Sequence, residues 1–160
     1  MGQVIAVIVC ILICESAGAL GGFFTSRSVA EWYPTLIKPS FTPPSWLFMP
    51  VWTTLYFMMG VSAFLIWKIG WQNNGVKIAL AVFIIQLALN IAWSAVFFGM
   101  RSPIGGMIVI VMLLLAILLT IILSFKLSKI SALLLVPYIL WVGFASALNA
   151  AIVYLNMARK

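Results

Sequence analysis

The chain has 160 residues, of which 66% are hydrophobic and 7% are charged, and it carries a formal net charge of +7. A soluble domain of this size carries roughly a quarter charged residues, so the composition excludes an ordinary water-soluble protein and predicts an integral membrane protein. The nine basic residues lie mainly at the ends of apolar runs. That placement is typical of interfacial anchors and argues against a nucleic-acid partner.

Five apolar runs are each about long enough to cross the hydrocarbon core of a bilayer as a helix. Continuous apolar runs favour helices over barrel strands, which alternate apolar and polar residues. We therefore predict an all-α, five-transmembrane-helix bundle that forms a single domain over residues 1–160, with its termini on opposite sides of the lipid bilayer. The basic residues divide almost evenly between the two sides, so they do not choose an orientation. The predicted spans are residues 4–24, 46–67, 78–98, 104–125 and 130–154.

The first run has small residues near its end, as a signal peptide has, but no Lys or Arg precedes it. We predict that it is a retained helix. Glu15 is the one acid within a span, and three interpretations stay open: a protonated and hydrogen-bonded carboxyl, a hydrated group near the interface, or a functional group. Gly18 and Gly22 have the spacing of a close helix contact, within one protomer or between two.

The connection over residues 25–45 contains four of the seven prolines. Because proline fixes φ and donates no hydrogen bond, we expect a stiff, extended lid. The other connections are short and enforce an up-down bundle. Any ligand chamber is therefore expected to open beneath this lid.

In the second span, Trp52 and Tyr56 are four residues apart and share a helix face. By position alone, this face fits a binding site or ordinary packing equally well. Trp46 and Trp67, at the two ends of the span, are typical of an interfacial aromatic belt.

In the third span, Gln86 and Asn90 are four residues apart, and Trp93 lies on the same broad face. Amide groups in lipid need partners, so this face is predicted to point into the bundle. The partner is either another helix or a ligand.

In the fifth span, Pro137 removes a backbone donor and is expected to kink the helix. Trp141 lies far from both ends of the run, four residues before the small Ala145. Phe144 and Leu148 are adjacent to this face. The arrangement predicts a slot that admits a flat aromatic ligand.

Four segments, in this order along the chain, resemble the translocator protein / tryptophan-rich sensory protein family, which includes the peripheral-type benzodiazepine receptor. They read WYPTLIKPSFTPPSW, PVWTTLYFMMG, QLALNIAWSAVFFGMR and VPYILWVGFASALN. The resemblance implies binding of porphyrins, such as protoporphyrin IX, and of related hydrophobic aromatic ligands. It also implies a homodimer.

The same resemblance implies which residues form the pocket. Family residues that match Trp52, Trp141 and Ala145 line it, and the resemblance also implicates lid and third-span residues. Together with the face arguments above, the predicted ligand site comprises Tyr33, Pro43, Trp52, Tyr56, Asn90, Trp93, Trp141, Phe144, Ala145 and Leu148.

Three functions compete. The first is a receptor, sensor or carrier that binds porphyrins. The second is an enzyme that degrades a bound porphyrin in light, with Trp52 and Trp141 as electron donors. The third is a transporter of porphyrins or sterols. The chain has no histidine, and neither cysteine lies near the predicted pocket, so we expect no metal site and no resident cofactor.

Leu148, Tyr154 and Arg159 fit a permissive sterol-recognition pattern, which is a weak signal. Phe41 stands where many relatives have tryptophan, and Ile91 and Gly105 also depart from the mammalian pattern. The chain ends without the basic tail of mammalian members. These departures favour a bacterial member of the family in the cell membrane.

Overall fold

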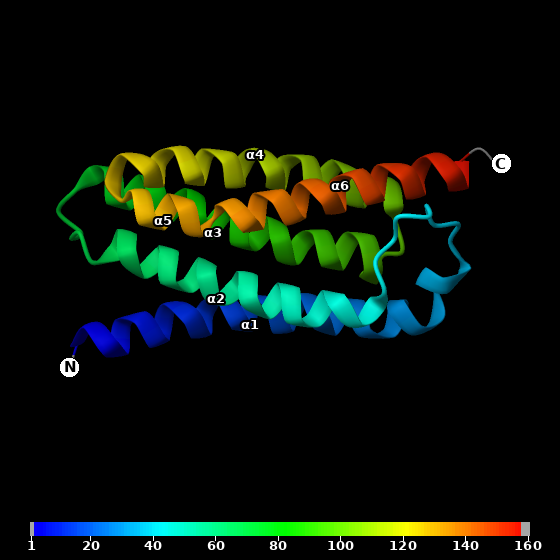
Figure 1. Cartoon of the computed structure of the whole chain (residues 1–160), viewed down its shortest axis with the longest axis horizontal. Coiled ribbons are helices and arrows are strands. Elements are labelled where there is room, and N and C mark those ends of the chain that lie inside the picture. Colours follow the sequence, from blue (N-terminus) through cyan, green and yellow to red (C-terminus); the bar gives the residue numbers. More distant parts are fainter. Residues whose placement is uncertain (1, 158–160) are drawn as a thin grey trace.

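The computed structural model describes residues 2–157, except for the side chain of Arg27. Within that range the regular elements are helices, and five segments are long and apolar enough to cross a membrane (Figure 1). This confirms the predicted all-α, five-helix bundle. The elements are α1 (Gly2–Glu31), the short turns η1 (Tyr33–Thr35) and η2 (Ser45–Leu47), α2 (Phe48–Trp67), α3 (Asn74–Ser94), the π-helical turn η3 (Ala95–Gly99), α4 (Pro103–Leu127), α5 (Lys129–Leu134) and α6 (Val136–Met157).

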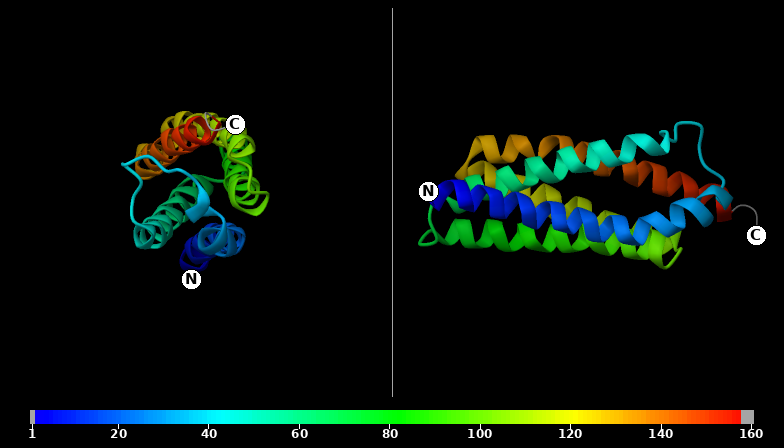
Figure 2. Two further views of the ribbon diagram at one scale, coloured as in Figure 1. Left: turned by 90° about the vertical axis from the view of Figure 1, so that its right-hand side faces the viewer. Right: turned by 90° about the horizontal axis from the view of Figure 1, so that it is seen from below.

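The spans run alternately up and down, and the two chain ends lie at opposite ends of the bundle (Figures 1 and 2). Helix α1 packs against α2 and α3, α3 against α4, α4 against α5 and α6, and α5 against α2. Since α5 and α6 belong to one span, the ring of helices is closed where α5 meets α2. Toward the other end, α2 and α6 diverge beneath the connection between α1 and α2 (Figure 1).

The end where α5 meets α2 is here called the sealed end. There the Oγ atoms of Ser62 and Ser131 lie 2.7 Å apart, and each hydroxyl lies 3.0 Å from the backbone carbonyl of the other residue. Gly60 is nearby, and a Cβ on it would lie 2.5 Å from the Cα of Ile11. Small side chains thus allow three helices to approach closely.

The opposite end is here called the lid end, and it differs from the prediction at one boundary. Helix α1 continues to Glu31, past the predicted end of the first span. The hydroxyls of Thr25 and Ser26 donate to carbonyls of their own helix, at 2.9 and 3.1 Å, which satisfies them without a loop. The lid is consequently residues 32–44, and it contains the turn Tyr33–Thr35 instead of being extended throughout.

The fifth span is interrupted at Leu135, between α5 and α6. The interruption lies two residues before Pro137, whose missing N–H cannot bond the preceding turn. The predicted kink is confirmed. Beyond the interruption, α6 runs in a direction different from that of α5 (Figure 1).

Gly18 and Gly22 of helix α1 have different surroundings. A Cβ on Gly18 would lie 2.5 Å from the ring of Tyr56, whereas nothing lies within 4 Å of such an atom on Gly22. Gly18 therefore serves packing within the chain. Glu15 lies in the middle of the 30-residue helix, and its three interpretations stay open.

Candidate functional site

A row of aromatic rings, in two contacting groups, lies between the diverging parts of α2 and α6, and we call it the aromatic site. Trp52 stacks on Tyr56 with ring centroids 5.5 Å apart and meets the ring of Tyr138 edge-on at 6.4 Å. Trp141 contacts Phe48 at 5.9 Å and Phe144 at 5.7 Å. The row is defined by Phe48, Trp52 and Tyr56 of α2 and Tyr138, Trp141 and Phe144 of α6.

Spacing explains why these rings face one another. Phe48, Trp52 and Tyr56 follow at four-residue intervals, so they form one stripe along α2. Tyr138 and Trp141 are three residues apart and share a face of α6. Helical periodicity therefore places both sets toward the interior, and ring size keeps the two helix axes apart.

A chain of buried polar groups lies beside the aromatic site and joins α2, α3 and α6. The Tyr56 hydroxyl donates to Oδ1 of Asn90 at 2.5 Å, and Nδ2 of Asn90 donates to the Tyr138 hydroxyl at 2.9 Å. Tyr138 in turn donates to Oε1 of Gln86 at 2.9 Å. All four side chains are buried. The prediction that the amides point into the bundle is confirmed, and their partners are tyrosine hydroxyls on two other helices.

Three buried side-chain atoms have no hydrogen-bond partner within the described part of the chain: Nε2 of Gln86, Oγ of Ser124 and Nε1 of Trp141. A buried donor without a partner is uncommon and points to an ordered water or a ligand acceptor. The Trp141 donor belongs to the aromatic site itself. The site can thus offer flat apolar surfaces together with an indole N–H.

A second aromatic cluster lies directly under the first part of the lid. Trp93 stacks on Phe97 at 5.5 Å, and its Nε1 donates to Oδ1 of Asn149 at 3.3 Å. Tyr33 of the lid packs on Phe98 at 5.8 Å, and Leu148 is buried in the same cluster. Since Trp93 packs against this cluster and the main core, it connects the two.

The predicted site residues therefore divide into two neighbouring groups. The first is at the aromatic site and contains Trp52, Tyr56, Asn90, Trp141, Phe144 and Ala145, the last packed against the main core. The second lies under the lid and contains Tyr33, Trp93 and Leu148. Pro43 is half-buried in the lid itself. The lid reaches the aromatic site through Phe41, whose ring meets Phe144 edge-on at 6.2 Å.

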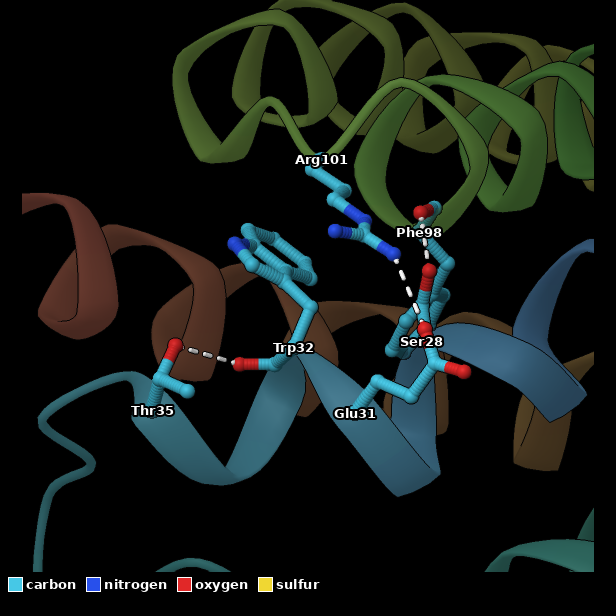
Figure 3. A network of polar contacts seen from close by, with 6 residues as sticks. All are labelled: Ser28, Glu31, Trp32, Thr35, Phe98 and Arg101. Atoms are coloured by element: carbon cyan, nitrogen blue, oxygen red, sulfur yellow. Dashed lines mark hydrogen bonds and ion pairs between the residues drawn. The ribbon is translucent and has the colours of Figure 1, made fainter.

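The end of α1, where the lid begins, is fastened to the segment between α3 and α4 (Figure 3). The Ser28 hydroxyl donates to the carbonyl of Phe98 at 2.5 Å, and Arg101 pairs with Glu31 at 3.2 Å. Trp32 packs its ring on Phe97 with centroids 5.7 Å apart. Burial raises the pKa of Tyr33 above its usual value, so its hydroxyl stays neutral at physiological pH.

Two members of the aromatic site, Phe48 and Tyr138, are absent from the predicted site. Phe48 lies four residues before Trp52, and Tyr138 lies three before Trp141. Helical spacing from the two predicted tryptophans is the signal that finds them. Trp46 and Trp67 are exposed, at 71% and 44% of their surface, as expected for belt residues.

The sterol pattern does not form one surface. Leu148 is buried inside the bundle, whereas Tyr154 is exposed. Arg159 lies outside the described residues. An apolar surface groove between α4 and α6 includes Tyr154 and does not include Leu148; it is lined by Met107, Ala150, Val153, Tyr154 and Met157.

Comparison with known proteins gives a consistent picture. The TspO/MBR family model matches residues 10–155. The chain is 46% identical to Tryptophan-rich protein TspO of Chlorobaculum tepidum, covering 96% of this chain and 98% of that protein. It is also 46% identical to Tryptophan-rich protein TspO of Archaeoglobus fulgidus, with 96% and 99% covered. Identity to the Translocator protein of Homo sapiens is 38%, with 83% and 82% covered. The chain, an integral multi-pass membrane protein, therefore belongs to the TspO/MBR family.

Proposed function

We propose that the protein binds protoporphyrin IX and related flat, hydrophobic aromatic molecules at the aromatic site, as a membrane receptor, sensor or carrier. The observation that carries this proposal is the row of rings contributed by both α2 and α6 where these helices diverge. Trp52 and Trp141 are only half-buried in it, although their neighbours Tyr56 and Tyr138 are buried.

A planar aromatic ligand can replace contacts between aromatic side chains with contacts of the same kind. An aromatic pair contributes about 0.5–1.5 kcal/mol beyond its buried area. A porphyrin inserted between α2 and α6 exchanges the contacts of Trp141 with Phe48 and Phe144 for contacts with its own larger ring system. Binding therefore requires side-chain rotation within the aromatic site, while the helices keep their places.

The unpartnered Nε1–H of Trp141 orients the bound ligand. It donates to an acceptor atom at the edge of the ligand, so aromatic ligands with an oxygen or nitrogen acceptor are favoured over plain hydrocarbons. Phe41 of the lid closes the aromatic site through its contact with Phe144, whereas Tyr33 packs on Phe98 in the neighbouring cluster.

The test is a dark titration of the purified protein with protoporphyrin IX, followed by the Soret absorbance of the porphyrin. We expect saturable binding in the parent and at least tenfold weaker binding in a Trp52→Phe/Trp141→Phe double variant, since each loses a large contact surface. The matched control is Trp46→Phe/Trp67→Phe, which removes two exposed tryptophans. Equal weakening in both double variants, or non-saturable uptake by the parent, would overturn the proposal.

Light-dependent degradation of the bound porphyrin, with Trp52 and Trp141 as electron donors, stays a separate prediction. Illumination of the parent and of the same double variant, both saturated with porphyrin, decides it, because only the parent is then expected to form product. Transport is decided by porphyrin flux into vesicles, compared with protein-free vesicles.

We further propose a homodimer in a bacterial cell membrane. The outward faces of α1 and α3 support a partner there, because they form an apolar groove lined by Val9, Leu12, Ile13, Ser16, Ala17, Leu20, Ile84, Leu87, Ala88 and Ile91. Crosslinking of a single-cysteine Ile84→Cys variant without Cys10 and Cys14, in native membranes, tests this expectation. Absence of a crosslinked dimer would count against this face.

A further inference from the structure

We propose that Asn156 is a positioning residue of the ligand site. It fastens the first part of the lid to α6 and leaves residues 39–44 as a flap that opens over the aromatic site. This inference rests on the proposed function, because the flap matters only if a ligand enters beneath it.

The contact between Asn156 and the lid is reciprocal. Oδ1 of Asn156 accepts from the backbone N–H of Ile37 at 3.1 Å, and its Nδ2 donates to the carbonyl of Ile37 at 3.0 Å. Nδ2 also donates to the carbonyl of Ile152 in its own helix, at 2.8 Å. One amide therefore satisfies both backbone polar groups of a residue that is 119 positions away in the chain.

Three of the lid residues before this contact, Trp32, Tyr33 and Leu36, pack against the bundle, whereas Pro34 and Thr35 are exposed. Trp32 packs on Phe97 and Tyr33 on Phe98. Leu36 packs against the cluster formed by Phe97, Leu148 and Ile152. Among the described residues, the Asn156 contact at Ile37 is the last polar contact in this series between the lid and the helices.

The residues after it are held differently. Thr42 bonds to the carbonyl of Pro39 through its N–H at 3.1 Å and its hydroxyl at 2.8 Å, so these bonds stay within the flap. The N–H of Leu47 bonds back to Pro44 at 3.0 Å. The aromatic contact of the flap with α6 is the edge of Phe41 against Phe144, and Phe41 is half exposed.

This contrast places a hinge between Lys38 and Pro39. A segment with few buried contacts and only local hydrogen bonds opens at a lower free energy than its packed neighbours. Opening of the flap separates Phe41 from Phe144 and uncovers the aromatic site, while Tyr33 stays in place. Asn156 fixes where the hinge lies, and through it the rate at which a ligand enters and leaves.

The first experiment needs no ligand. Hydrogen–deuterium exchange of residues 36–47 is measured in the parent and in Asn156→Leu, which keeps the branched side-chain shape and loses both bonds to Ile37 together with the bond to the carbonyl of Ile152. We expect these amides to exchange about tenfold faster in the variant, with the helices unchanged, since two neutral hydrogen bonds to the lid are lost. The control Thr35→Val removes a bond that stays within the lid, to the carbonyl of Trp32. Parent-like exchange in Asn156→Leu would overturn the proposal.

A second variant tests the same proposal if Asn156→Leu does not fold. Asn156→Asp retains an acceptor for the Ile37 N–H and loses the donor to its carbonyl, so we expect an intermediate increase in exchange. No increase in Asn156→Asp would then count against the proposal.

The second experiment uses protoporphyrin IX, released from the loaded protein into excess empty detergent micelles. Release is expected to be about tenfold faster from Asn156→Leu than from the parent or Thr35→Val. Identical release rates would contradict the role in ligand passage. If the parent does not bind the porphyrin saturably, the proposed function fails, and the exchange experiment still decides whether Asn156 holds the lid.

Discussion

The sealed end and the lid end of the bundle are built from different kinds of side chain. At the sealed end, Gly60 and the pair Ser62–Ser131 let α1, α2 and α5 approach to backbone contact. At the lid end, the rings of Trp52 and Trp141 lie between α2 and α6. Small residues close a helix pair in lipid because they allow backbones to touch. Large rings keep helices apart, and their mutual contacts can be exchanged for contacts with a ligand. One end thus supplies stability, and the other supplies the capacity to bind.

The strongest test of the sealed end is Gly60→Val. Its Cβ would lie 2.5 Å from Cα and 2.9 Å from N of Ile11, and these backbone atoms cannot rotate away. We expect a loss of about 3 kcal/mol in the free energy of unfolding, at the upper end of overpacking effects, seen as a lower melting temperature in detergent. Gly22→Val is the control, because nothing lies within 4 Å of a Cβ there. Equal melting temperatures for the two variants would show that the ends do not differ in tightness.

At the lid end, Tyr138→Phe tests the polar chain beside the rings. Removing this hydroxyl leaves Nδ2 of Asn90 and Oε1 of Gln86 without their partner in a buried setting. We expect a loss of about 2 kcal/mol in stability and weaker protoporphyrin binding, because Tyr138 also contacts Trp52. Tyr154→Phe removes an exposed hydroxyl and should keep the parent's melting temperature. A Tyr138→Phe protein as stable as the parent would rule out a structural role for the buried hydrogen bonds of Tyr56, Asn90, Tyr138 and Gln86.

Ser62→Ala separates the two ends most cleanly. Its hydroxyl bonds only to Ser131 across α2 and α5 among the described residues, so we expect a loss of about 1 kcal/mol in stability. Protoporphyrin affinity should stay unchanged, since the pair is remote from the rings. Ser26→Ala serves as control, because its hydroxyl bonds within α1 and is exposed. A drop in affinity with Ser62→Ala would mean that the ends are coupled.

The smallest effect is expected for Glu31→Gln at the outer edge of the lid end. Glu31 and Arg101 pair at 3.2 Å with side chains that are 68% and 51% exposed. Such a pair contributes less than about 1 kcal/mol, and salt screens it. Melting temperatures of parent and variant should differ slightly at low salt and converge at high salt. A difference that persists at high salt would indicate a contact beyond the ion pair.

Sequence alone determined the membrane class, the number of spans and the inward faces. A helix in lipid must satisfy its own backbone, so the length and apolarity of each run settle its structure locally. The need of amides for partners in lipid predicted that Gln86 and Asn90 point inward. The position of Trp46 at a span end predicted that it lies at the surface, and the missing donor of Pro137 predicted the bend in the fifth span. Each of these depends on the residues of one run.

The tertiary structure determined the contacts between helices, which the sequence of a single apolar run does not specify. Periodicity shows that Tyr56 and Asn90 each face inward, but their contact depends on how α2 and α3 are rotated and staggered. The division of the predicted site into two clusters has the same origin, as does the role of Gly18, which is fixed by the ring of Tyr56 on another helix. The Asn156–Ile37 pair joins residues 119 positions apart and has no local pattern. Contacts between distant segments are set by the packing of whole helices, and the sequence of any single helix leaves that packing open.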